Sequence, residues 1–134
     1  MQNFTEIQAL MKSELDLMNK ILVDRLDSNV DLINQMSHYI INSGGKRIRP
    51  LLLLICAKAT EYEGDYHYSM AVVIELIHTA TLLHDDVVDQ SKTRRGHETA
   101  NELWGNAPSV LVGDFLYSRA FEIMVEPNSM SIMK

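Results

Sequence analysis

The feature that most constrains the fold is a long apolar segment, residues 67–90, which ends in three closely spaced aspartates. Apolar residues occupy most faces of a helix drawn through this segment, and Glu75 and His78 are among the few polar interruptions. A helix that is apolar nearly all round has to be covered by other elements, because water would otherwise contact its hydrophobic side chains. We therefore expect a central, buried helix around which the rest of the chain is arranged.

The other segments also carry helical patterns. Residues 4–26 have apolar side chains at steps of three and four, which predicts one amphipathic helix. Further helices are expected over residues 31–42, about 50–61, about 98–104 and about 108–125. The SGG sequence at 43–45 ends a helix because glycine adopts the left-handed C-cap conformation, and Pro50 suits the first turn of the next helix.

The segments between the predicted helices are short and polar. We expect loops at EYEGDY (61–66) and SKTRRGH (91–97), and no segment shows a convincing strand period or an internal repeat. A chain of 134 residues has the size of one domain. Since short connections join antiparallel neighbours, the prediction is an all-α antiparallel helical bundle.

The charge distribution indicates which partners to expect. The formal net charge is −6, so the overall surface should repel nucleic acids and anionic membranes. Half of the twelve Lys and Arg residues lie in two short clusters: Lys46, Arg47 and Arg49, and Lys92, Arg94 and Arg95. An acidic chain with two local basic clusters favours binding of small anions.

Cysteine content and hydropathy indicate the compartment. Cys56 is the only cysteine, so no internal disulfide can form and a reducing compartment is expected. Its apolar surroundings predict an inert thiol in the core. The longest apolar region, residues 70–84, falls short of the ~20 residues that a bilayer requires, and the N-terminus does not resemble a secretory signal. A cytoplasmic location follows as the expectation.

The acidic cluster breaks several rules for a stable helix end. Asp85 and Asp89 lie one turn apart, Asp86 lies off their line, and His78 lies two turns earlier on nearly the same face. The carboxylates repel each other, and the helix dipole disfavours anions at this end. A divalent cation would remove the conflict, and a set of carboxylates favours Mg²⁺ over zinc. The alternative is a solvated acidic helix end.

The basic clusters are placed to hold anions beside these carboxylates. Lys46 and Arg49 are three residues apart at a glycine-rich break, where they can converge on one anion. Arg94 and Arg95 follow Asp89 closely enough to face the same ligand. Two anion sites and one metal site indicate two phosphorylated substrates, one of them bound to metal. For the first cluster, the alternative is a solvated loop beside a helix start.

Four blocks, GGKRIRP, ELIHTATLLHDDVVD, RRGHETAN and SVLVGDFLYSRAF, together resemble the trans-isoprenyl diphosphate synthases (polyprenyl synthetases) in order and spacing. They span residues 44–122, and the resemblance is nearest to bacterial long-chain members. It implies an all-α isoprenoid synthase fold around a deep cavity. It also implies a Mg²⁺-dependent transferase of isoprenoid and quinone side-chain biosynthesis, with the full-length form a homodimer.

The activity implied by the resemblance is head-to-tail condensation of isopentenyl diphosphate onto an allylic diphosphate. In this family the Lys and Arg of the first block and the His of the central helix bind isopentenyl diphosphate, which corresponds to Lys46, Arg49 and His78. By the same resemblance, Arg94 meets the allylic diphosphate and Arg95 meets isopentenyl diphosphate.

The resemblance also assigns roles on the central helix. Asp85 and Asp89 correspond to the Mg²⁺ ligands, with Asp86 in support, and these three aspartates and the first arginine of RRG form the catalytic set. The residues five and four positions before the first aspartate help to set product length in the family; here they are Ala80 and Thr81. Their small side chains favour a long product.

The chain departs from the family in two places. Glu98 stands where many members carry a small residue or proline. A second aspartate-rich motif is expected downstream in the family, whereas after residue 90 this chain contains only Asp114. We therefore interpret residues 1–134 as the N-terminal part of a single synthase domain, apparently truncated and inactive alone. The alternative is a non-catalytic helical partner subunit of a longer synthase.

Two other enzyme classes share parts of the pattern. An HD-type metal phosphohydrolase would use His84 and Asp85, but the remaining histidines show no matching pattern and the basic clusters would be unexplained. A terpene cyclase shares the DDxxD motif and the ionisation chemistry. It does not need a second diphosphate site, so Lys46, Arg49 and Arg95 argue against it.

Overall fold

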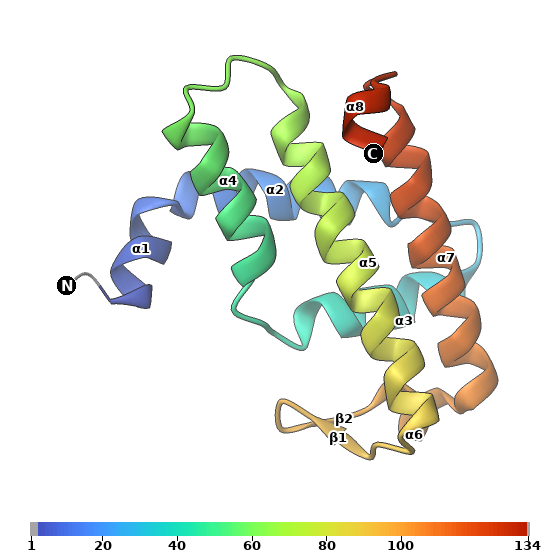
Figure 1. The fold of residues 1–134 in the computed structure, drawn as a ribbon. Helices are drawn as coiled ribbons and strands as arrows, with labels where there is room; N and C mark the ends of the chain where they lie inside the picture. The colour runs from blue at the N-terminus through green and yellow to red at the C-terminus, as the bar shows by residue number, and fades with distance from the viewer. Residues whose placement is uncertain (1–2, 134) are drawn as a thin grey trace.

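The computed structural model describes residues 3–133, most of which lie in helices (Figure 1). The helices are α1 (Phe4–Leu10), α2 (Lys12–Arg25), α3 (Asp31–Asn42), α4 (Ile48–Ala59), α5 (Tyr66–Val88), α6 (Ala100–Trp104), α7 (Asn106–Val125) and α8 (Met130–Met133). A hairpin of β1 (Thr93–Arg94) and β2 (His97–Glu98) lies between α5 and α6. The prediction of an all-α fold is confirmed.

Helix α5 occupies the centre of the molecule, as its apolar sequence predicts. It runs between α4 and α7, with α2 behind it (Figure 1), and it contacts all three. The side chains that it buries are Ala71, Val72, Val73, Glu75, Leu76, Thr79, Ala80, Leu83 and Asp86. Three of these are polar, and two carry a carboxylate. Among residues 3–133, no helix combines the length and the hydropathy needed to cross a membrane.

The N-terminal segment differs from the single helix that we predicted over residues 4–26. It forms α1 and α2, separated at Met11, whose backbone angles (φ −102°, ψ 15°) leave the helical region. Asn3 starts α1 with a capping box, in which it exchanges hydrogen bonds with Glu6. The bend carries the Met11 side chain into the core, where it is 5% exposed. Core burial therefore overrides the continuous helical pattern here.

The segment predicted to be an irregular loop at 91–97 contains the hairpin. Thr93 pairs with Glu98 and Arg94 with His97, in antiparallel register. The turn residues Arg95 and Gly96 both have positive φ, at 53° and 80°, as the tight turn of a two-residue hairpin requires. Strands of two residues are too short to show a period in the sequence, which is why the prediction missed them.

Helix α7 begins at Asn106, two residues before the predicted start, so Pro108 lies inside its first turn. Proline is tolerated there because the first helical N–H groups have no intrahelical partner. Helix α7 packs along α5 and buries a stripe of small and apolar residues: Ser109, Val112, Gly113, Leu116, Ala120 and Ile123. This pairing forms the largest part of the core.

The prediction that Cys56 lies in the core is wrong, since the thiol is exposed. Helix α4 buries only the side that carries Pro50, Leu51 and Leu54. Cys56 lies on the opposite side, four residues after Leu52, which is 60% exposed. An apolar run does not reveal which of its faces will be covered.

Leu76 on α5 offers a test of this core. It is fully buried, whereas Leu111 on α7 is 67% exposed. We expect Leu76→Ala to lower the free energy of unfolding by about 2–5 kcal/mol, because it removes buried methyl groups and leaves a cavity. The matched variant Leu111→Ala should change it by less than about 0.5 kcal/mol. Denaturant unfolding measures both, and equal losses would contradict the central placement of α5.

Candidate functional site

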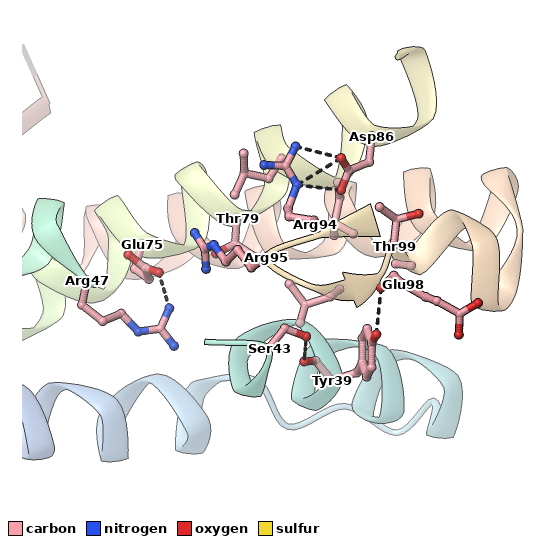
Figure 2. Close-up of a pocket in the computed structure, with 14 residues that line it drawn as sticks. Tyr39, Ser43, Arg47, Glu75, Thr79, Asp86, Arg94, Arg95, Glu98 and Thr99 are labelled. Carbon is pink, nitrogen blue, oxygen red and sulfur yellow. Dashed lines mark hydrogen bonds and ion pairs between the residues drawn. The ribbon is translucent and has the colours of Figure 1, made fainter. Parts of the chain in front are cut away.

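Two segments that are distant in the sequence meet at α5. They are the α3–α4 connection (residues 43–47) and the hairpin at 93–98. A narrow void lies beneath the hairpin, lined by residues of α3, α5 and α6 as well (Figure 2). An open cleft of about 390 Å³ adjoins it and shares Arg47, Glu75 and Arg95 with it. Half of the eight residues that line the cleft are Lys or Arg.

Arg47 and Glu75 form a buried ion pair between the α3–α4 connection and α5 (Figure 2). Their side chains are 14% and 6% exposed. The second guanidinium nitrogen of Arg47 donates to the backbone oxygen of Ile41 at 2.9 Å. The sequence grouped Arg47 with two exposed cations, but only the partner on α5, 28 residues away, identifies Arg47 as the buried one.

Lys46, Arg49 and His78, predicted to act together, line the open cleft. Arg49 Nη1 lies 3.2 Å from His78 Nε2, and both cations are exposed while His78 is half-buried. Burial, followed by the positive charge of Arg49, lowers the pKa of His78, and the carboxylate of Glu75 opposes this effect. The ring is therefore neutral near pH 7 without a bound anion. The structure brings the three predicted residues together, while their roles stay predictions.

Asp86 and Arg94 pair with each other (Figure 2). Arg94 Nε donates to Asp86 Oδ2 at 2.9 Å, and Nη2 donates to Oδ1 at 2.8 Å. The hydrogen bonds to Asp86 raise the pKa of Arg94. Asp86 is only 5% exposed, so its carboxylate is committed to this pair. The sequence predicted that Arg94 faces a substrate diphosphate; in this structure it holds the hairpin against α5.

Asp85 and Asp89 are exposed at the C-terminal end of α5, and Asp89 is the C-cap residue. Across residues 3–133, no group of three or more His, Cys, Asp and Glu side chains is close enough to hold a metal ion together. Mg²⁺ usually takes one or two protein carboxylates and completes its shell with water and substrate phosphates. Two exposed carboxylates one turn apart fit that mode of binding.

Arg95 joins the two basic clusters that the sequence treats separately. Its backbone is left-handed, with φ 53°, and its guanidinium donates to the backbone oxygen of Gly44. The same guanidinium lies against Gly45, where any Cβ would collide with it. The glycine-rich break therefore leaves room for the Arg95 guanidinium, a contact that the sequence analysis did not predict.

The two predicted chain-length residues differ in environment. Ala80 is fully buried, whereas Thr81 is exposed and its hydroxyl donates to the backbone oxygen of His78 at 2.8 Å. Thr81 and Asp85 are one turn apart on the exposed side of α5. The influence of both residues on product length stays a prediction.

His84 contacts α7 rather than the neighbouring aspartates. Its Nε2 lies 3.2 Å from the backbone oxygen of Val110 and 3.4 Å from Asp114 Oδ1. Gly113 permits this approach, because a Cβ at that position would meet the imidazole ring. The sequence offered His84 and Asp85 as a metal pair for an HD-type phosphohydrolase, and the α7 contacts of His84 count against that interpretation.

Comparison with known proteins identifies the family of this chain. The family model described as polyprenyl synthetase matches residues 30–134. The chain belongs to the polyprenyl synthetase family.

The similar relatives include long-chain prenyl diphosphate synthases. The chain is 49% identical over 132 residues to octaprenyl diphosphate synthase of Escherichia coli (strain K12), covering 98% of this chain and 41% of that protein. It is 41% identical over 130 residues to the geranyl-diphosphate-specific all-trans-nonaprenyl-diphosphate synthase of Rhodobacter capsulatus, covering 96% and 40%. The chain thus spans about two-fifths of the length of these relatives.

Solved structures agree with this assignment. A decaprenyl diphosphate synthase from Rhodobacter capsulatus matches with a TM-score of 0.93 and 41% identity, over 98% of this chain and 41% of that one. A polyprenyl synthase from Caulobacter crescentus CB15, complexed with calcium and isoprenyl diphosphate, matches with a TM-score of 0.92 and 45% identity, over 96% and 39%.

The unequal exposure of Asp86 and Arg94 predicts unequal effects of mutation. Arg94→Ala would leave a buried carboxylate without a partner, so we expect it to lower the free energy of unfolding by about 1–3 kcal/mol, reduced from the fully buried case because Arg94 is 37% exposed. Asp86→Asn keeps an acceptor for Arg94 and should lower it by less than about 1 kcal/mol. Denaturant unfolding of both variants measures the two losses, and an unchanged stability of Arg94→Ala would contradict the pairing.

Proposed function

We propose that this chain supplies the first diphosphate-binding and metal-binding half of a trans-prenyltransferase site that makes long-chain polyprenyl diphosphates. The observation that carries the proposal is the cationic cleft of Lys46, Arg49 and His78, beside the exposed Asp85 and Asp89 on one helix. The long-chain synthases among its relatives support it. So does the Caulobacter crescentus structure, whose complex holds calcium and isoprenyl diphosphate.

In this proposal the cleft binds isopentenyl diphosphate. Lys46 contributes a point charge, and Arg49 contributes a planar fork that can make two parallel hydrogen bonds to phosphate oxygens. His78 supplies a ring nitrogen beside Arg49, on the helix that also carries the aspartates. The cleft and the aspartates both lie on α5, which packs against α4, α7 and α2. The helix therefore sets the distance between bound isopentenyl diphosphate and the allylic diphosphate.

Asp85 and Asp89 would hold Mg²⁺ with the allylic diphosphate, and Mg²⁺ would supply positive charge to neutralise the departing pyrophosphate. The allylic C–O bond breaks with both electrons leaving on pyrophosphate. The isopentenyl double bond then attacks the allylic carbon, and loss of a proton restores a double bond. Arg94 is paired with Asp86 through Nε and Nη2, and in this proposal the exposed part of its guanidinium stabilises the charge that develops on pyrophosphate.

A second candidate function is a helical subunit that assembles with a longer synthase. Exposed apolar side chains on α7, including Leu111, Phe121 and Val125, favour it. The name of one relative gives it only weak support: heptaprenyl diphosphate synthase component 2 of Geobacillus stearothermophilus is 33% identical over 118 residues. Co-expression with a full-length synthase separates the two, because only a subunit should purify in a stable complex with it. We propose a homodimeric whole protein on the resemblance, and a cytoplasmic location because a single cysteine is expected in a reducing compartment.

Under the main proposal, the 134-residue chain should not transfer prenyl groups on its own. One aspartate-rich motif is present, and a second set of carboxylates is needed to bind the remaining diphosphate oxygens through metal. We expect no product above background when the purified chain is incubated with labelled isopentenyl diphosphate, an allylic diphosphate and Mg²⁺. Turnover comparable to that of a full-length synthase would contradict this division of the site.

Substitutions in the cleft test substrate binding directly. Arg49→Ala should weaken isopentenyl diphosphate binding by roughly tenfold to a hundredfold, because it removes charge-assisted hydrogen bonds. Lys20→Ala, at an exposed lysine on α2 outside the cleft, serves as the control and should leave the affinity unchanged. Isothermal titration calorimetry measures both. Equal affinities in the two variants would remove the cleft as the binding site.

Binding should also depend on the protonation of His78. Its pKa is lowered without ligand, and a nearby diphosphate would raise it, so binding takes up a proton and strengthens as the pH falls. His78→Asn cannot take up this proton. The ratio of wild-type to variant affinity for pyrophosphate should therefore rise between about pH 7.5 and about pH 6. Using the ratio cancels the titration of pyrophosphate itself, and a constant ratio would contradict the role of His78.

A further inference from the structure

We propose that the buried Arg47–Glu75 ion pair is a positioning device, which holds Arg49 and His78 in the geometry that binds diphosphate. The inference rests on the proposed function of the cleft. Arg47 and Glu75 are positioning residues in this account, since they act through their neighbours.

Two neighbouring contacts join the start of α4 to the middle of α5, and we call them the inner rung (Arg47 with Glu75) and the outer rung (Arg49 with His78). Arg47 pairs with Glu75, and Arg49 lies against His78, three residues further along α5 and on nearly the same face. The inner rung is buried and charged on both sides, whereas the outer rung borders the open cleft. The inner rung therefore fixes the register of the outer one.

The backbone of Arg47 supports a positioning role. Arg47 caps α4 in the left-handed conformation, with φ 49° and ψ 35°, which is unfavourable for a residue with a Cβ. Such a conformation persists where surrounding contacts determine it. Here the contacts are the ion pair with Glu75 and the hydrogen bond to the backbone oxygen of Ile41. This turn sends the Arg47 side chain inward while Lys46 and Arg49 remain exposed.

The pair also keeps a carboxylate away from the bound anion. Glu75 lines the same cleft as Arg49 and His78, so an unpaired Glu75 would compete for Arg49 and repel a diphosphate. Arg47 neutralises Glu75 from the buried side. Arg49 is then free to contact His78 and a phosphate oxygen. In this proposal Lys46 and Arg49 bind the ligand, and Arg47 holds the α3–α4 connection against α5.

A double variant separates positioning from stability. Replacing a buried ion pair by apolar residues is often neutral or stabilising, so Arg47→Met with Glu75→Leu should keep the helical circular dichroism and the unfolding midpoint. Its affinity for inorganic pyrophosphate, measured by calorimetry, should nevertheless fall by roughly tenfold or more, since the remaining groups are no longer held in place. Unchanged affinity would overturn the proposal.

A mutant cycle tests whether the ion pair affects pyrophosphate binding through Arg49. Arg49→Ala should weaken pyrophosphate binding strongly in the unmodified chain and only slightly in the double variant, because Arg49 is already misplaced there. Equal effects in both backgrounds would overturn positioning while leaving the proposed function intact. No effect of Arg49→Ala in the unmodified chain would overturn the proposed function, and the inference with it. If the double variant does not fold, Glu75→Gln, which keeps the size of the side chain, is subjected to the same cycle and the same criteria.

Discussion

The burial of α5 between α4, α7 and α2 is the constraint on which the rest of the structure depends. This helix is apolar enough to form the centre of the core, yet it also carries the polar residues of the candidate site. The buried residues and the polar site residues lie on different sides of the helix. Leu76 and Ala80 lie fully inside the core, whereas Thr81, Asp85 and Asp89 remain exposed on the other side. A rigid core helix thereby fixes the distance between the cationic cleft and the acidic end.

Two buried carboxylates connect this core to the loops around it. Glu75 and Asp86 both lie on α5, and each pairs with an arginine from a basic cluster, Arg47 or Arg94. In both clusters one arginine turns inward, while its neighbours stay exposed or contact the opposite loop. A buried carboxylate without a partner would be strongly unfavourable, so the pairing specifies where each loop lies. We infer that Lys46 and Arg49 remain exposed because Arg47, which lies between them, is held by its ion pair with Glu75.

The sequence predicted the helices that form because of their own residue pattern. The pattern over residues 31–42 and the apolar run of α5 contain their own periodicity, and α3 and α5 appear close to the predicted bounds. The predictions failed where distant partners decide the outcome. The core contact of Met11 bends the first helix, and only the arrangement of α4 in space shows that Cys56 is exposed. Likewise, the motifs assigned no role to Arg47, and only its ion pair with Glu75 on α5 shows that its side chain is largely covered.

We propose that the cleft beside α5 binds diphosphate through Lys46 and Arg49 while Arg47 stays paired with Glu75. A crystal structure of the chain with pyrophosphate and Mg²⁺ tests it most directly. We expect pyrophosphate to contact Lys46, Arg49 and His78, with Arg47 still paired with Glu75. Pyrophosphate bound elsewhere on the chain, or Arg47 released from Glu75 to bind it, would contradict the account.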